Sequence, residues 1–176
     1  MTATFDTVGK EELRRLLLRN WMTHDAMWFM HAVNELGIER TNGLNRAAVR
    51  SMATVEAKRI LRLLGLERVT TPDDVRRFFD TAIELVIPDF MEFSWEWGPE
   101  NRSVRFEITK CFAHEGTTAL GVVERYECGI YDRIYGWLDA LGVGHEVAPD
   151  VAHCTMHHDG QCVRDLAITL EPPAAP

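Results

Sequence analysis

The sequence predicts an α+β fold, with a helical N-terminal half followed by a mainly antiparallel sheet with packed helices. In the first half, apolar residues recur at intervals of three and four, which is the period of an α-helix. From residue 91 onward the period changes to two, as in a strand with one buried face. We expect a helical region over residues 1–86, an α+β metal-binding region over 87–170 that packs with it as one compact unit, and a loosely attached tail over 171–176.

Three helices are expected in the N-terminal half. The first spans about residues 13–36 and the second about 44–64, and a glycine, the residue that most often closes a helix, follows each of them. Residues 23–25 of the first include types that favour helix caps, so we expect a break there. The third helix is expected to start at Thr71, because a proline and two aspartates in its first turn are typical of a helix N-terminus. It should stop before Pro88.

The second half is expected to contain two hairpins separated by a helical segment. Residues 91–97 and 103–111 alternate between apolar and polar side chains and are joined by a turn, so they form the first hairpin. Residues 116–141 return to the helical period and end at a glycine. The remaining strands are expected over residues 145–147, 152–158 and 161–170.

Charge and composition argue against two classes of partner. The net charge of −8 is unsuited to a nucleic-acid backbone, which requires a basic surface. We find no apolar run long enough to span a bilayer, and the first residues lack the order of a signal peptide. We therefore expect a cytoplasmic protein without nucleic-acid or membrane partners, in which cysteines are free thiols or metal ligands rather than disulfides.

The four cysteines are the strongest candidates for a metal site. Cys128 opens a helix, where the helix N-terminus should lower the pKa of its thiol. In the stretch HCTMHHDGQC, residues 153–162, a three-residue turn with Gly160 in the left-handed conformation would bring Cys154 and Cys162 to one face of a hairpin. Other loop lengths place them on opposite faces, and buried free thiols or a disulfide remain alternatives to a metal.

The segment from residue 124 to 168 resembles the 4-vinyl reductase, or hydrocarbon-binding, domain. The shared pattern is a cysteine that opens an apolar helix ending in Leu-Gly, followed by two cysteines with seven residues between them and glycine in the turn. The spacing of Cys128, Cys154 and Cys162 is similar to that of phenol-sensing members, and the resemblance implies that these three cysteines bind zinc. Those members supply a glutamate where this chain has Val151. The fourth ligand is then expected from Cys111, His153, His157, Glu127 or solvent.

The first predicted helix carries a stripe of aromatic and titratable residues that is typical of a ligand pocket with acid/base capacity. Its members are Trp21, His24, Asp25, Trp28 and His31. The alternative is that the histidines only border an ordinary core stripe. His24 and His31 lie seven positions apart, so a metal held by these two alone is not expected.

The same stretch resembles a second family. The motif His24-Asp25-x-x-Trp28-Phe29, followed by Glu35-x-Gly37-x-Glu39 and Asn45, is similar to bacterial proteins of the L-2-amino-thiazoline-4-carboxylate hydrolase-like family. That family also has a helical front and a cysteine-bearing back half. The resemblance implies an enzyme that acts on a small polar ring compound.

Two functional hypotheses follow from these features. The first is a metal-dependent hydrolase that cleaves a C–N or C–S bond of a small polar or cyclic compound, with His24 and Asp25 as the acid/base pair and with Trp28, His31 and Trp95 binding the substrate. Zinc is the expected metal, although iron and copper bind to the same types of ligand. The expected metal ligands are Cys111, Cys128, Cys154 and Cys162.

The second hypothesis is a small-molecule-binding or sensor domain with a structural zinc. A further possibility beside these two is a structural homodimer without a small ligand, which the long first helix would serve. A metal fully ligated by protein favours the sensor. A metal with an open position facing a cavity that contains His24 favours the enzyme.

Overall fold

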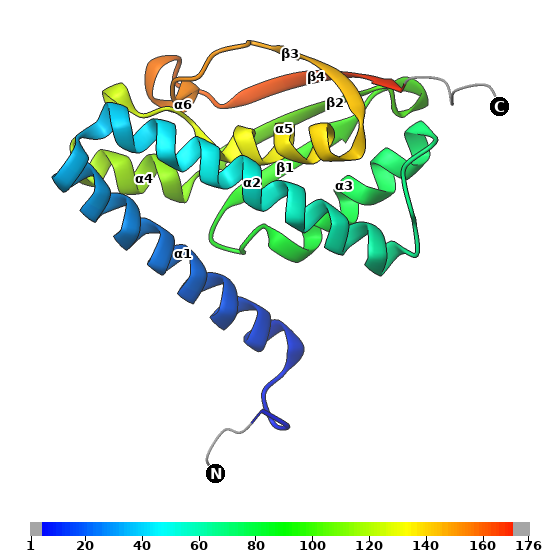
Figure 1. The fold of residues 1–176 in the computed structure, drawn as a ribbon, viewed down its shortest axis with the longest axis horizontal. Helices are drawn as coiled ribbons and strands as arrows, with labels where there is room; N and C mark the ends of the chain where they lie inside the picture. The colour runs from blue at the N-terminus through cyan, green and yellow to red at the C-terminus, as the bar shows by residue number, and fades with distance from the viewer. Residues whose placement is uncertain (1–4, 171–176) are drawn as a thin grey trace.

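The computed structural model describes residues 5–170 and contains one four-stranded sheet with helices on one of its faces. The strands are β1 (Glu92–Trp97), β2 (Ser103–Lys110), β3 (Val143–Ala148) and β4 (Val163–Leu170), in the spatial order β1-β2-β4-β3. Every neighbouring pair is antiparallel. Three helices lie on the same side of this sheet: α2 (Ile38–Leu64), α3 (Pro72–Val86) and α5 (Gly129–Leu141) (Figure 1). The predicted α+β class is confirmed. The predicted tail at 171–176 lies outside the described residues.

The N-terminal half forms α1 (Lys10–Leu36), α2 (Ile38–Leu64) and α3 (Pro72–Val86). The predicted break at residues 23–25 is wrong, because α1 runs through them without interruption. The second helix also begins earlier than predicted. Gly37, with a φ of +78°, turns the chain, and α2 then starts directly with the fully buried side chain of Ile38.

The predicted start of α3 is confirmed in detail. The Asp74 N–H donates to the Thr71 hydroxyl at 3.1 Å, and the Thr71 N–H donates to the Asp74 carboxylate at 3.0 Å, which together form a capping box. The Thr70 N–H also donates to the Asp74 carboxylate, at 2.9 Å, and this hydrogen bond, together with those from Thr71, holds the pKa of the Asp74 carboxyl below its usual range. The helix packs Phe78 and Phe79, both fully buried, onto the sheet side of the core.

The predicted first hairpin is also confirmed. In β1 and β2, Trp95 pairs with Phe106 and Trp97 pairs with Val104. The alternating residues Val104, Phe106 and Ile108 of β2 are buried, as the period of two requires.

The second predicted hairpin is wrong. Residues 155–158 are not a strand but a short helix, α6 (Thr155–His158), and β4 pairs instead with β3 and β2. Because β4 already has a neighbour on each side, the segment between β3 and β4 leaves the sheet. Gly160 does adopt the predicted left-handed conformation, with a φ of +72°.

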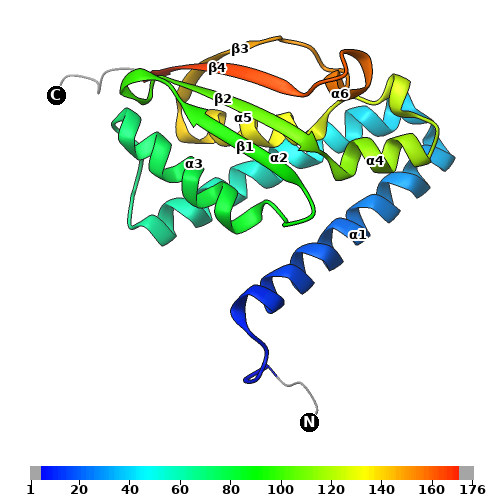
Figure 2. The same ribbon diagram turned by 180° about the vertical axis from the view of Figure 1, so that it is seen from behind.

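The single predicted helical segment at 116–141 consists of two helices. They are α4 (Phe112–Ala119) and α5 (Gly129–Leu141), separated by a 3₁₀ turn at Val123–Arg125. Helix α5 lies between α2 and the sheet (Figure 2), and one continuous core includes residues from both halves of the chain. By contrast, the N-terminal part of α1 projects beyond the other helices (Figures 1 and 2), and Arg14 and Arg15 in this part donate to the Ile87 carbonyl and the Asp89 carboxylate after α3. Within residues 5–170, no helix is both long and apolar enough to cross a membrane.

Candidate functional site

A cavity of about 380 Å³ lies between α1, α2, α4 and α5, and we call it the α1 cavity. Its volume falls within the range of typical small-molecule sites. Its walls come from both halves of the chain. Aromatic and apolar side chains dominate the lining: Trp21, Trp28, Phe29, Met52, Phe112 and Tyr126.

Asp25 is the acidic group in this lining. Burial raises the pKa of its carboxyl, and the charges of His24 and Arg133 oppose that rise without cancelling it. Among residues 5–170, no side chain forms a hydrogen bond or an ion pair with the Asp25 carboxylate. Asp25 therefore places a carboxyl group that has no hydrogen-bond or ion-pair partner among these residues against an apolar cavity.

Arg133 also lines the α1 cavity, but its charge is already paired. Its Nε and Nη2 atoms donate to the Glu56 carboxylate at 2.8 and 2.6 Å. The guanidinium lies 5.1 Å from the ring centroid of Trp21 and 5.4 Å from that of Trp137. This arrangement fixes Arg133 as part of the cavity wall.

The structure brings together three of the five residues predicted at the catalytic and substrate site. His24, Asp25 and Trp28 line the α1 cavity, whereas His31 and Trp95 do not. His31 is exposed on α1. Trp95 lies on β1, where its Nε1 atom donates to Asp80 of α3 at 2.8 Å, because the apolar face of that strand is turned toward α3.

Sequence reasoning missed several residues of this site, including Tyr126 and Arg133. They come from the segments before and within α5, which carry no local motif linking them to α1. Only the packing of α5 against α2 brings them to the cavity.

The four cysteines line a second, much smaller cavity of about 10 Å³, which we call the cysteine cavity. All four are free thiols. Backbone hydrogen bonds bring their segments together. The Cys128 N–H donates to the Ala152 carbonyl at 2.7 Å, and the Ile108 N–H donates to the Cys162 carbonyl at 2.9 Å. The predicted grouping of these cysteines therefore occurs, although the predicted hairpin does not.

Three of the four cysteines occupy the position just before a helix. Cys111 precedes α4, Cys128 precedes α5 and Cys154 precedes α6. The backbone N–H groups in the first turn of each helix act to lower the pKa of the preceding thiol.

Burial nevertheless has the larger effect on these thiols. It raises the pKa of Cys111 to about 11 and that of Cys128 to about 12. The pKa of Cys154 is also raised, again chiefly by burial. The lowered pKa predicted for Cys128 is therefore wrong for the metal-free protein, because the loss of hydration outweighs the helix N-terminus.

Within the described residues, no group of three or more His, Cys, Asp and Glu side chains is arranged to hold a metal ion directly. Of the fourth-ligand candidates, Cys111 and His153 line the cysteine cavity. His157 instead lies 2.8 Å from the Glu124 carboxylate, and Glu127 pairs with Arg46. The donors available in this cavity are thus mainly sulfur.

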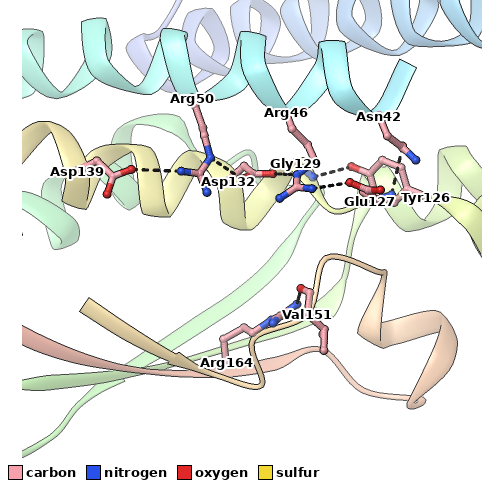
Figure 3. Close-up of polar contacts among 10 residues, drawn as sticks. All are labelled: Asn42, Arg46, Arg50, Tyr126, Glu127, Gly129, Asp132, Asp139, Val151 and Arg164. Carbon is pink, nitrogen blue, oxygen red and sulfur yellow. Dashed lines mark hydrogen bonds and ion pairs between the residues drawn. The ribbon is translucent and has the colours of Figure 1, made fainter. Parts of the chain in front are cut away.

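Arg164 is a buried cation beside the cysteines. Its side chain is only 1% exposed and lines the cysteine cavity. The guanidinium donates to the carbonyl oxygens of Pro149 and Val151, the latter at 2.8 Å (Figure 3), and lies 4.9 Å from the Tyr131 ring. Among residues 5–170, it has no carboxylate partner, and its Nε atom has no hydrogen bond. A buried charge without a counter-ion is costly.

An ionic network fixes the backbone around Cys128. Buried Asp132 of α5 accepts hydrogen bonds from Arg46 and Arg50 of α2, the latter at 2.7 Å (Figure 3). Arg46 also contacts Glu127, and the Glu127 N–H donates to Asn42 at 3.2 Å. These contacts tie the start of α5 to α2.

The two cavities are neighbours with different chemistry. Ala113, Tyr126 and Ile130 belong to the lining of both. No cysteine lines the α1 cavity, and neither His24 nor Asp25 lines the cysteine cavity.

Comparison with known proteins adds one similarity. Residues 7–88 match a protein family described as "Family of unknown function (DUF6125)", and this stretch includes α1, α2 and α3. No curated protein matches the sequence significantly. The two resemblances stated from the sequence remain predictions.

Proposed function

We propose that this protein binds a small, mainly apolar molecule in the α1 cavity, and that the four cysteines hold a structural zinc ion. The observation that carries the first part is the α1 cavity itself, with its volume of about 380 Å³ and its aromatic lining. It is the arrangement expected of a binding or sensor domain.

Binding is favoured over hydrolysis by the separation of the two cavities. A metal-dependent hydrolase needs its metal and its acid/base pair to face the same substrate. Here His24 and Asp25 face the α1 cavity, whereas the cysteines line the other one. A zinc ion with four cysteine ligands would also keep no open position for water or substrate.

Donor chemistry and charge support zinc in the cysteine cavity. Four cysteine ligands match the tetrahedral coordination of structural zinc sites, and zinc would link the segments that precede α4, α5, α6 and β4. Zinc with four thiolates carries a net negative charge, for which the buried guanidinium of Arg164 is a counter-ion. Loading would require the thiols to lose their protons and turn toward one point.

The binding proposal is tested by filling the cavity. Ala48 lines the α1 cavity, whereas its exposed neighbour Ala47 does not. We expect small aromatic compounds such as benzylamine and benzyl alcohol to raise the melting temperature of the wild-type protein. This shift should disappear in Ala48→Trp and persist in the matched control Ala47→Trp. Equal shifts in both variants would place binding elsewhere.

The zinc proposal is tested by metal analysis of the purified protein. We expect about one zinc ion per chain, and a marked loss of both zinc and thermal stability in Cys154→Ser and in Cys111→Ser. His157→Ala serves as the control, because His157 pairs with Glu124 and does not line the cysteine cavity. A metal-free wild-type protein that melts at the same temperature as Cys154→Ser would contradict the proposal.

A further inference from the structure

We infer that the molecule bound in the α1 cavity is an organic cation: an aromatic or apolar body that carries a protonated amine facing Asp25. This inference rests on the proposed binding function and adds the chemical class of the ligand. Its basis is the combination of aromatic walls with a carboxylate that has no hydrogen-bond or ion-pair partner among the described residues.

Three residues of α1 form the recognition surface. Trp21, Asp25 and Trp28 are separated by four and three positions, so their side chains share one face of the helix. All three line the α1 cavity. Asp25 therefore lies between two tryptophans along this face of α1. The Arg133 guanidinium already contacts the Trp21 ring, and the electron-rich face of the Trp28 indole attracts cations as well as apolar groups.

The charge balance of the lining selects for a cation. Arg133 is held by its two hydrogen bonds to Glu56. Its charge and that of His24 act on Asp25, but within the described residues neither side chain forms a hydrogen bond or an ion pair with the carboxylate. A desolvated carboxylate gains most from a partner that brings a positive charge and a hydrogen-bond donor. The net charge of −8 also favours the approach of cations over anions.

A second polar side chain in the same lining suits an ammonium group. Asn45 is buried in the wall formed by α2, and within the described residues its amide forms no hydrogen bond. The hydroxyl of Thr117, by contrast, donates to the Ala113 carbonyl at 2.7 Å. Asn45 thus offers an amide oxygen as a further acceptor for an N–H donor.

Three probes carry the same benzene ring but differ in charge: benzylamine, benzyl alcohol and phenylacetate. Comparing them distinguishes the contribution of the ligand's charge to binding from that of its apolar ring. Calorimetric titration of the full chain at neutral pH should show benzylamine binding at least about tenfold more tightly than the other two. In Asp25→Asn this preference should fall to near equality. Glu35→Gln removes the same charge from an exposed position of α1 outside the cavity lining, and it should retain the preference.

The outcomes distinguish this inference from the binding function on which it rests. Should none of the three probes bind, the binding function itself fails. If benzyl alcohol or phenylacetate binds as tightly as benzylamine, the cavity binds small molecules but the cation assignment is overturned. The assignment is also overturned if Glu35→Gln loses the preference as fully as Asp25→Asn, because net charge would then explain it.

Discussion

Asp25 shows how a single carboxyl group connects stability with binding in this protein. Its side chain is partly buried and lacks a partner among the described residues, so burial raises the pKa of its carboxyl. Groups of this kind cost folding free energy and are typical of functional sites. Folding disfavours the charged form of Asp25, and the cost therefore depends on pH.

We expect Asp25→Asn to raise the melting temperature by a few degrees at pH 7.5. The folded-state pKa of Asp25 lies above its ordinary value of 3.8, so the cost is absent below that value and develops as the pH rises through the folded-state pKa. The gain of the variant should therefore shrink toward zero near pH 4. Thermal unfolding of both proteins across this range measures it, and a gain that is independent of pH would contradict this account.

At the scale of single residues, the sequence predicted those cavity residues that lie together on one helix. His24, Asp25 and Trp28 were predictable because they share a face of α1. Arg133 was not, because its place in the cavity depends on the packing of α5 against α2. The cysteines were predicted to lie together because of a hairpin that does not form, since spacing alone cannot distinguish a hairpin from a helical turn.

The contact between α2 and α5 depends on a position without a side chain. A Cβ atom at Gly136 of α5 would lie 2.8 Å from the Ala53 Cβ atom and 3.3 Å from the Arg50 Cα atom, both in α2. Close packing of the two helices is therefore possible only with glycine.

We expect Gly136→Ala to lower the free energy of unfolding by about 1–3 kcal/mol, because the helices must separate to admit a methyl group. Gly43→Ala in α2 is the matched control, since nothing lies within 4 Å of its added Cβ. That substitution should stabilise the protein by about 0.5–1 kcal/mol through helix propensity. Urea denaturation compares the two variants, and a Gly136→Ala protein as stable as Gly43→Ala would refute the close approach.

At the scale of elements, the sequence predicted the features that depend on residues near one another in the chain. It did not predict those that depend on contacts between distant segments. The capping box at Thr71 and the period of two in β1 and β2 involve residues near one another in the chain. The segment between β3 and β4 was misread as a strand, because the sequence does not reveal that both edges of β4 are already occupied.

The shape of the whole molecule is unusual at α1, whose N-terminal part stands away from the remaining helices (Figure 1). This part of α1 carries exposed apolar side chains: Leu16 is 54% exposed and Leu17 is 59% exposed. The homodimer predicted from the sequence stays a prediction, and it would cover this surface with α1 of a second copy.

Sedimentation velocity at micromolar protein concentration tests that prediction. We expect the wild-type chain to sediment as a dimer and the double variant Leu16→Ser, Leu17→Ser to shift to the monomer, because the substitutions remove apolar area from the contact. Leu63→Ser is the control, since Leu63 is 72% exposed but lies on α2. A monomeric wild-type protein would rule the dimer out.

The wall of Ala113, Tyr126 and Ile130 that both cavities share has a thermodynamic consequence. If both sites are filled as proposed, any movement of this wall on zinc loading alters the space offered to the ligand. Linkage then requires reciprocity: the factor by which zinc changes the dissociation constant of the ligand equals the factor by which the ligand changes that of zinc. A change in metal supply would in that case be read out as a change in the concentration at which the protein responds to its ligand.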